Sequence, residues 1–508
     1  MVEEYRERED KYQVEASWLM PALTDFTPPG GRIDERTVRL ASRYLDTEDR
    51  SLLEHRVTLR IRHGELDSGW QLKLPDGTGR TELRLPAGGA VAGDSNAQPP
   101  AELAELVLGL CAGRSLITVA TLHTERRLSR LLDADGGLVA EVADDLVLAT
   151  VPGSPEQRWR EVEVELGSGD ERLLAEIGAL LTGAGARPAE AASKLGRALG
   201  VLRVGPPDRP ARRLGELVAS YLDAQFRALT AGDLQLRRGG HPIHSTRVAT
   251  RRYRSVLRVF AKLFQADRRD ALDTELAWYA GLLGEVRDRE VLRGRLAEAV
   301  RELPAELVLG PVAAAIDEQL GAEQAAARAE LARELAGDRY LALQAELTAW
   351  HRQPPFTAAA DRSAGRVRRY LQRAERAMDK RLRAAQRAAA QAGLSHEEAL
   401  TQGSADERLH RARKAAKRAR YTGELARPRL GEPASRLVSA ATALQDQLGA
   451  HQDGVVASES LLRLGAMAGG RPGENGFTYG LLYARLLYRA RPELAFDPDP
   501  DEPAGSIH

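Results

Sequence analysis

The sequence predicts an α+β protein of two domains. A closed antiparallel β barrel with a charged lumen and covering helices precedes an all-helical domain. Three observations point to this fold class. Polar and aliphatic residues alternate along several segments of the first 200 residues, whereas Ala- and Leu-rich segments with helical periodicity fill most of the remainder. The two parts carry opposite charge, and the second contains a long internal repeat.

The zero net charge of the chain hides the asymmetry between its parts. Lys plus Arg and Asp plus Glu each number 73. Residues 1–200 hold 24 basic and 34 acidic side chains, a balance of −10, so the other residues, with 49 and 39, have a balance of +10. We therefore expect two domains with different electrostatic roles. Cys111 is the single cysteine, which excludes an intrachain disulfide. No signal peptide or membrane span is apparent in the sequence, so we expect a cytoplasmic protein.

Several segments of the first part alternate with the period of a β-strand. Polar side chains occupy every second position in Glu7-Glu9-Lys11, Arg60-Arg62, Gln71-Lys73 and Glu161-Glu163-Glu165. One such strand is typical of a sheet with one face in water. Several together favour a closed barrel with charges inside and helices packed on its apolar outer face. We expect these helices near residues 35–45, 101–110 and 171–181.

This part resembles the CYTH, or triphosphate tunnel metalloenzyme, superfamily. The resemblance begins with Glu7-x-Glu9-x-Lys11, a motif that is weak when it stands alone. Further matches follow in order: Tyr44-Leu45-Asp46-Thr47, Leu59-Arg60-Ile61-Arg62, Leu72-Lys73, Arg126, Glu141 with Asp145, Glu161-x-Glu163-x-Glu165, and Ser193-Lys194. The set is specific because it keeps this order over about 190 residues. The resemblance implies an eight-stranded antiparallel tunnel that binds a triphosphate and a divalent metal.

The residue types agree with that chemistry. A triphosphate carries about four negative charges and needs several fixed cations. The candidate substrate-binding residues are Lys11, Arg60, Arg62, Lys73, Arg126 and Lys194. Glutamates in the same lumen would repel phosphate unless a hard cation lay between them. The candidate ligands of Mg²⁺ or Mn²⁺ are Glu7, Glu9, Glu161 and Glu163. Such a metal would neutralise developing charge and orient or activate a water. Glu165 and Asp145 are the catalytic candidates for positioning that water.

The second part contains a cationic helical motif in two copies. The first copy, His244, Arg247, Arg251, Arg252 and Arg254, recurs as His410, Arg413, Lys417, Arg418 and Arg420. Offsets of zero, three, seven and ten residues share one narrow arc of a helix. A second echo follows each copy, as Leu283-Gly284 with Asp288 and as Leu448-Gly449 with Asp453. Like charges at helical spacing destabilise a helix by a few tenths of a kcal/mol per pair. Their repetition therefore indicates an anionic partner.

The repeat resembles the CHAD domain, over roughly residues 212–490. The resemblance rests on His-x-x-Arg-Val-x-x-Arg-Arg-x-Arg and on a later copy that ends at Tyr421. It implies an all-α bundle of two similar halves that binds inorganic polyphosphate. We expect the polymer to contact both cation rows. A further segment, residues 366–387, places Arg366, Arg369, Arg373, Arg376 and Lys380 at helical spacing. This row either widens the cationic surface or is a solvated helix face.

Other ligands fit these residues less well. A metal site at His241, His244, His410 and His451 is disfavoured, because Arg and Lys crowd all of them except the last and no compact ligand spacing appears. Nucleic acid is disfavoured as the principal ligand, because aromatic residues make up only 5% of the chain and no nucleic-acid-binding motif appears.

The sequence therefore predicts metal-dependent hydrolysis of inorganic triphosphate or of polyphosphate ends, with the helical domain holding the polymer. A non-catalytic protein that binds or targets polyphosphate is the first alternative. A nucleotidyl cyclase is the second, because the CYTH superfamily includes adenylyl cyclases. The expected domains are 1–204 for the tunnel, 205–211 for the linker and 212–490 for the helical domain, with a disordered tail at 491–508. The expected partners are polyphosphate and a small triphosphate, with no membrane.

Overall fold

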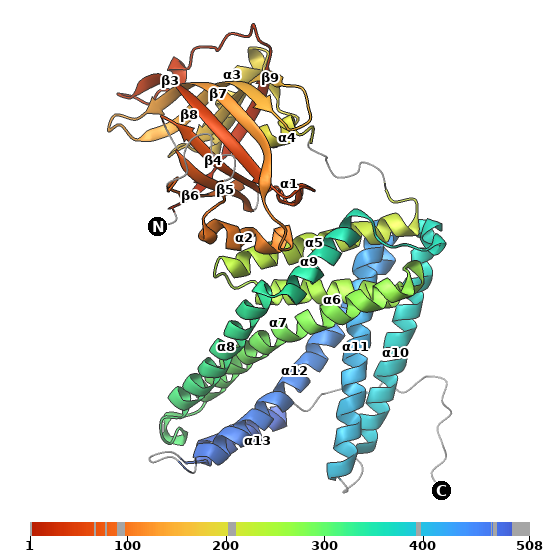
Figure 1. The fold of residues 1–508 in the computed structure, drawn as a ribbon. Helices are drawn as coiled ribbons and strands as arrows, with labels where there is room; N and C mark the ends of the chain where they lie inside the picture. Colours follow the sequence, from red (N-terminus) through yellow and green to blue (C-terminus); the bar gives the residue numbers. More distant parts are fainter. Residues whose placement is uncertain are drawn as a thin grey trace, which may run out of the picture. The chain divides into compact units, whose positions relative to one another are not determined.

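In the computed structural model, the chain divides into two compact units, residues 1–208 and 209–508 (Figure 1). The structure describes residues 3–65, 68–76, 79–88, 97–201, 210–392, 398–468, 470 and 475–489. The predicted tail and most of the predicted linker lie outside these residues. The first unit is built on a β-sheet and the second is helical, which confirms the α+β class. Among the described residues, no helix has the length and apolar composition that a bilayer crossing requires.

One antiparallel sheet forms the first unit. Its strands in the described ranges are β1 (Glu3–Glu7), β2 (Glu9–Val14), β3 (Arg32–Asp46), β4 (Thr58–Gly64), β5 (Gly69–Asp76), β6 (Gly79–Leu85), β7 (Ile117–Leu132), β8 (Leu138–Thr150), β9 (Gln157–Leu166) and β10 (Arg187–Pro188). Their order across the sheet is β1-β6-β5-β4-β3-β7-β8-β9-β2-β10.

A bend at Arg8 closes this sheet into a barrel. The strands β1 and β2 follow each other in the chain, yet β1 pairs with β6 at one edge of the sheet and β2 pairs with β9 near the other. The two short strands are thus halves of one bent strand. With the two-residue β10 set aside, eight strands surround the lumen, as expected for the predicted tunnel.

The helix expected at residues 35–45 is wrong, because these residues lie in β3. Val38, Leu40, Ser42 and Tyr44 alternate along this strand and are all buried. Ser42 and Tyr44 contact lumen arginines, so the inward row continues the period of two that marks the other strands. A long strand with charged residues on its outer face imitates an amphipathic helix over a short window, which explains the error.

In the described part of this unit, four α-helices accompany the barrel: α1 (Ser51–Glu54), α2 (Ala101–Cys111), α3 (Glu171–Gly183) and α4 (Lys194–Ala198). The helices α2 and α3 confirm the predictions at 101–110 and 171–181. Asp170 caps α3 by accepting a hydrogen bond from the Leu173 amide at 2.9 Å. Leu195 and Ala198 of α4 share an apolar cluster with Trp159 of β9. This packing holds Lys194, the first residue of α4, against the lumen.

The second unit is all-helical in its described residues. Its main helices are α5 (Leu214–Arg237), α6 (Ile243–Val259), α7 (Ala266–Arg301), α8 (Val312–Ala336), α9 (Asp338–Arg352), α10 (Val367–Ala392), α11 (Glu398–Leu430), α12 (Glu432–Ala468) and α13 (Phe477–Arg489). The pairs α7/α8, α10/α11 and α12/α13 lie side by side as hairpins (Figure 1). The helices α6 and α11 also pack together, which brings the two copies of the sequence repeat into contact.

Candidate functional site

The barrel lumen is lined by more cations than carboxylates. Its eight cationic side chains are Lys11, Arg60, Arg62, Lys73, Arg80, Arg84, Arg126 and Lys194. Its six carboxylates are Glu7, Glu9, Glu82, Glu141, Glu163 and Glu165. The structure thus brings together all six residues predicted to bind a substrate. Behind these lining residues, Asp145 and Glu161 pair with Arg126 and Lys194, so cations and carboxylates number eight each. An anionic ligand is therefore favoured where a cation lacks a carboxylate partner, not by an overall excess of positive charge.

Glu163 lies where three of these cations meet. Its carboxylate contacts Lys11 and accepts charged hydrogen bonds from Arg126 and from Lys194, each at 2.7 Å. Burial alone would raise the pKa of Glu163, but Lys11, Lys194 and Arg126 outweigh it and hold the pKa well below its usual range. Glu163 therefore remains ionised and keeps the three cations in place.

Asp145 is fully buried and also holds cations. Arg126 donates to both of its carboxylate oxygens, at 2.7 and 2.6 Å, and the Lys194 ammonium lies 2.9 Å away. Burial raises the pKa of Asp145, but Arg126 and Lys194 reverse the shift and lower it. Both oxygens of Asp145 are thus engaged by two residues predicted to bind phosphate, and the expected role of Asp145 in positioning a water stays a prediction.

A second group of carboxylates lies around Glu165. The strand register places Glu165 of β9 opposite Glu9 of β2 and opposite Glu141 of β8. Burial and the nearby carboxylates of Glu7 and Glu9 raise the pKa of Glu165 to about 7. Burial also raises the pKa of Glu7. One Glu7 oxygen contacts Lys73 at 2.8 Å, and the other is buried without a hydrogen-bond partner.

Glu161 lies apart from this group, although the sequence suggested that it shares a metal with Glu7 and Glu9. It pairs across the sheet with Gln13 and Asp145. It accepts a hydrogen bond from the Trp159 indole at 2.6 Å and lies 2.8 Å from Lys194. Four residues of strand, about 13 Å, separate it from Glu165.

The donor set around Glu165 fits a hard divalent cation. Carboxylate oxygens are the ligands that Mg²⁺ and Mn²⁺ prefer. A cation there would relieve the mutual repulsion of Glu7, Glu9 and Glu165 and would engage the unpartnered Glu7 oxygen. In the structure, Lys73 forms an ion pair with Glu7, and Lys11 forms one with Glu9. No group of three potential ligand side chains converges on one point within the described ranges.

Arg62 is the lumen cation whose charge is least compensated. It is 6% exposed and donates to the Ser42 hydroxyl at 3.3 Å. No carboxylate of the described chain lies within ion-pair distance of its guanidinium. Burial and the adjacent Arg60 and Arg126 lower its pKa to about 9. An isolated buried cation is costly, so this position favours an anion from outside the protein.

The lumen residues that the prediction from sequence missed include Arg80, Glu82, Arg84 and Tyr44. Arg84 donates to Glu82 at 2.6 Å, and Arg60 donates to the Tyr44 hydroxyl at 2.8 Å. Glu82 and Arg84 alternate with two leucines on β6, which is the same signal that identified the lumen residues of β4 and β5. Tyr44 belongs to a matched motif, but nothing in the sequence assigned its side chain to the lumen.

The second unit carries a cluster of like charges where α6 meets α11. The central cation cluster consists of Arg247, Arg251, Arg413 and Lys417. Burial and the neighbouring Arg413, Arg251 and Arg247 lower the pKa of Lys417 to about 7. Burial also lowers the pKa of Arg251. The Nε atoms of Arg251 and Arg413 are buried and find no hydrogen-bond acceptor among the residues that the structure describes. Four crowded cations with unpartnered donors favour an anionic ligand.

Two glycines explain the second echo of the repeat. A Cβ atom on Gly284 of α7 would lie 3.2 Å from the Arg247 guanidinium, and one on Gly449 of α12 would lie 3.4 Å from that of Arg413. Asp288 and Asp453, four residues after each glycine, lie 2.9 and 4.0 Å from the same two arginines. Each repeat therefore seats one arginine over a glycine and ties it to an aspartate.

The other predicted polyphosphate-binding residues differ in their surroundings. Arg252 and Arg420 both pair with Glu424, and Arg254 pairs with Asp273. The pairs of Arg252 and Arg254 join α6 to α11 and to α7, the Arg420 pair lies within α11, and all three leave less positive charge for a ligand. His244, His410 and Arg418 are exposed. Burial, Arg287 and Arg251 lower the pKa of His244, which places it beside the central cation cluster.

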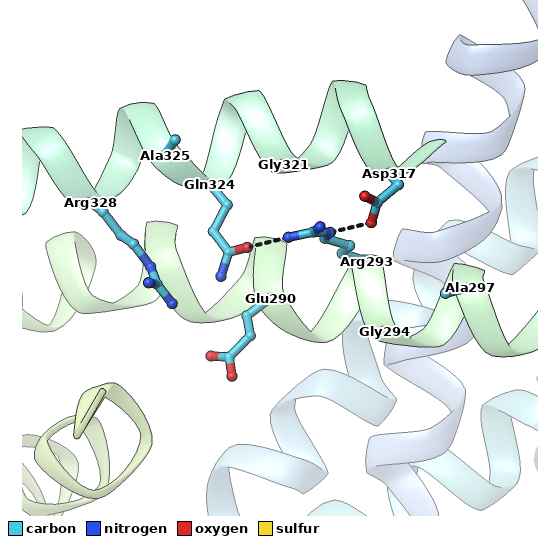
Figure 2. A pocket seen from close by; sticks show the side chains of 9 residues that line it. All are labelled: Glu290, Arg293, Gly294, Ala297, Asp317, Gly321, Gln324, Ala325 and Arg328. Carbon is cyan, nitrogen blue, oxygen red and sulfur yellow. Dashed lines mark hydrogen bonds and ion pairs between the residues drawn. The ribbon is translucent and has the colours of Figure 1, made fainter. Parts of the chain in front are cut away.

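The helical unit also has a hollow between α7 and α8 (Figure 2). Arg293 spans it and donates to Asp317 at 2.6 Å and to Gln324 at 3.4 Å. The walls beside these residues are formed by Gly294, Gly321 and Ala325. Two cations, Arg293 and Arg328, and two carboxylates, Glu290 and Asp317, line this hollow, so its charges balance in number, unlike those of the central cation cluster.

Comparisons with known proteins agree with this division of the chain. Residues 31–192 match the CYTH domain, and residues 220–462 match the CHAD domain. An uncharacterized protein of Mycobacterium tuberculosis is 33% identical over 509 aligned residues, which cover 96% of this chain and 94% of that protein.

Two solved structures are similar to parts of the chain. PptA from Streptomyces chartreusis is 22% identical, with a TM-score of 0.45, over 55% of this chain and 95% of its own. The CHAD domain from the plant Ricinus communis is 26% identical, with a TM-score of 0.42, over 56% of this chain and 91% of its own.

Proposed function

Because the chain belongs to the family of proteins that join a CYTH domain to a CHAD domain, we propose that it is a triphosphatase that binds polyphosphate. The barrel hydrolyses inorganic triphosphate or the ends of polyphosphate with Mg²⁺ or Mn²⁺, and the helical unit binds the polymer. The observation that carries the proposal is Arg62, a buried cation in the lumen with no carboxylate partner in the described chain.

In the lumen, the cations bind the phosphate groups of the substrate, and the carboxylates bind the metal or orient the cations. Arg62 and Arg60 bind phosphate oxygens, and their planar guanidinium groups suit bidentate contacts. Lys11, Lys73, Arg126 and Lys194 complete the cationic wall, with Glu163 and Asp145 as the carboxylates that orient them. A chain of phosphates thus lies in a preorganised positive field and needs no rearrangement of water.

The metal site of this proposal is built from Glu7, Glu9 and Glu165, with Glu163 at its border. A bound Mg²⁺ or Mn²⁺ would neutralise charge on the phosphoryl group and activate a water. Glu165 keeps its predicted role of positioning the water. It binds the metal and positions the water only when its carboxylate is ionised. Glu161 is left to hold Lys194 and Trp159 in place.

The central cation cluster of the helical unit binds polyphosphate in this proposal. Arg247 and Arg251 come from the first repeat, and Arg413 and Lys417 come from the second. A polyanion that lies across the cluster neutralises both rows at once. It also supplies acceptors for the unpartnered Nε atoms of Arg251 and Arg413.

A non-catalytic protein that binds phosphate chains is the second candidate. One observation favours it: Glu7, Glu9 and Glu163 are each paired with a lumen lysine. A lumen that neutralises its own carboxylates in this way could bind a phosphate chain through the remaining cations and leave no ligands for a metal.

A phosphate-release assay separates the two candidates. The wild type is given tripolyphosphate, ATP or thiamine triphosphate, with Mg²⁺ or Mn²⁺. The Arg62→Met variant, which keeps an unbranched side chain without the charge, should lose on the order of 100-fold in rate or more. The exposed Arg39 of β3 provides the matched control, Arg39→Met. Equal rates for wild type and Arg62→Met would contradict the proposal. Binding of tripolyphosphate without phosphate release would favour the second candidate.

A further inference from the structure

The helix α10 presents a row of six cations to the solvent. The α10 stripe consists of Arg369, Arg373, Arg376, Lys380, Arg383 and Arg387, all of them exposed. Their spacing alternates between four residues and three. At about 100° per residue, all six fall within an arc of roughly 80°. The row is about 27 Å long at a rise of about 1.5 Å per residue.

The opposite face of α10 fixes the direction of this row. Val367, Leu371, Met378 and Ala385 are buried in the main core of the helical unit. Tyr370 packs beside this face and stacks on Phe260, the residue that follows α6, with ring centroids 4.5 Å apart. The stripe therefore faces solvent along its whole length because the apolar side of the helix is anchored.

The stripe has no compensating acidic partners. Within the part of the chain that the structure describes, no carboxylate lies within ion-pair distance of any of its six cations. Glu375 and Asp379 lie on the same helix but outside the arc. Successive members of the stripe are three or four residues apart, and each like-charge pair costs a few tenths of a kcal/mol of helix stability. The row thus does not serve the stability of the helix.

The corresponding helix of the first repeat has no such row. The helix α5 precedes α6 as α10 precedes α11, and its arginines Arg227 and Arg237 pair with Asp223 and Asp233. The repeat can therefore fold without a cationic stripe. The stripe also lies on a different helix from the central cation cluster, whose members belong to α6 and α11.

The chemistry of the stripe favours a linear phosphate polymer. A row of cations about 27 Å long suits an extended polyanion better than a single phosphate group. The arc contains no aromatic side chain on which bases could stack. It also contains no apolar side chain that could enter a lipid layer.

We propose that the α10 stripe is a second polyphosphate-binding surface, which binds a stretch of a long chain whose other stretch occupies the central cation cluster. This inference rests on the proposed function, since it needs the central cation cluster to bind polyphosphate. Two surfaces on one polymer make the second contact intramolecular, so the stripe strengthens binding of long chains by raising the effective concentration. Chains too short to reach both surfaces gain nothing from it.

The test compares long-chain polyphosphate with chains too short to reach both surfaces, on the full-length protein and over a series of salt concentrations. The stripe variant replaces Arg369, Arg373, Arg383 and Arg387 by Gln, which keeps the helix propensity and removes four charges. It should bind long chains at least tenfold more weakly, with a flatter salt dependence. Its affinity for short chains should equal that of the wild type. A matched control replaces four ion-paired arginines by Gln: the exposed Arg227, Arg258 and Arg339 and the partly exposed Arg293.

Each outcome separates this inference from the proposed function. If Arg413→Gln weakens binding of both chain lengths and the stripe variant binds long chains like the wild type, the stripe inference is wrong and the central cluster stands. If the control weakens long-chain binding as much as the stripe variant does, the effect is one of net charge and the inference fails. If the wild type binds duplex DNA through the stripe and does not bind polyphosphate, both proposals are overturned.

Discussion

Glu165 and Glu161 lie on the same strand and point into the same barrel, yet their neighbours differ in charge. Glu165 faces the carboxylates Glu9 and Glu141, whereas Glu161 faces Lys194 and the Trp159 indole. Carboxylates that repel each other favour a divalent cation, and a carboxylate held by an ammonium does not. The register of the strands thus decides whether a lumen glutamate lies beside other carboxylates, and can share a divalent cation with them, or beside a lysine.

Substitution of these two glutamates should separate their roles. Glu165→Gln removes one of the proposed metal ligands, so the metal concentration that gives half-maximal phosphate release should rise by about tenfold or more. Glu161→Gln should change that concentration less and should instead lower thermal stability, because Lys194 loses a partner. Metal titrations of activity and thermal melts of both variants check this prediction. If Glu161→Gln raised the half-maximal metal concentration more than Glu165→Gln does, Glu161 would be a metal ligand, as expected from the sequence.

Lys417 should make polyphosphate binding depend on pH. Burial and the nearby arginines lower its pKa to about 7, from 10.5. The folded protein without ligand therefore gains stability as pH rises from about 7 toward 10.5, because the unfolded chain holds the proton more tightly. A bound polyanion favours the charged lysine, so affinity should fall as pH rises above about 7, by at most about tenfold per pH unit. Lys417→Arg keeps the charge and should remove this dependence. Isothermal titration calorimetry measures the polyphosphate affinity of both proteins at several pH values of 7 and above, where His244 is neutral. If the affinity of Lys417→Arg fell with pH as that of the wild type does, Lys417 would not be the group responsible.

The side chains of the lumen were predictable from the sequence to a large extent, but their pairing was not. Alternation alone identified Arg60, Arg62 and Lys73, because a period of two puts them on one face of a strand. The register between β2, β8 and β9 decides whether Glu161 or Glu165 lies beside Glu9, and it depends on the bend at Arg8 and on barrel closure. These long-range features leave no local pattern in the sequence.

At the scale of helices, Gly284 and Gly449 should matter more for polyphosphate binding than for stability. Ala is about 1 kcal/mol better than Gly inside a helix. Gly284→Ala and Gly449→Ala should therefore leave thermal stability equal or higher, apart from local strain. Gly284→Ala should nevertheless weaken polyphosphate binding several-fold, because its methyl group would lie 3.2 Å from the Arg247 guanidinium, which must then shift by a few tenths of an ångström. Gly449→Ala should weaken binding less, because 3.4 Å to the Arg413 guanidinium is close to ordinary contact.

Gly281 provides the control for this prediction. It lies on the same helix as Gly284, and a Cβ atom there would meet no other atom within 4 Å. Gly281→Ala should raise stability and leave the affinity unchanged. Thermal melts and polyphosphate titrations of the three variants make the comparison. If all three variants bound alike, the seating of the arginines would not matter for the ligand.

The elements that the sequence predicted well are those with one unambiguous period. The helices α2 and α3 have apolar residues on one face, and α3 has the Asp170 cap. The strand β3 was missed because its outer face is charged and its inner face is mixed, so that neither period dominates over a short window. The α10 stripe was seen only in part, since Arg383 and Arg387 join it once the exposed face is known.

At the scale of the whole molecule, the two units should work when they are separated. The opposite charge balances of the two parts agree with one unit that binds metal and one that binds a polyanion. A chain cut between residues 205 and 210 should give a fragment 1–204 that keeps the phosphate-release activity, and a fragment 211–508 that keeps polyphosphate binding. Circular dichroism of each fragment establishes folding before the assays. A folded 1–204 fragment that fails to hydrolyse a substrate of the whole protein would refute this division of labour.

The bend at Arg8 also constrains the order in which the barrel can assemble. Residues 3–14 are synthesised early, yet their partners on β6 and β9 extend to residue 166. Such distant pairings form slowly, because a long stretch of chain must be ordered before they are made. The segment that completes the barrel also carries Glu7, Glu9 and Lys11. A partly assembled sheet therefore lacks its closing strand together with Glu7 and Glu9, so under the proposed function it lacks two of its metal ligands until the barrel closes.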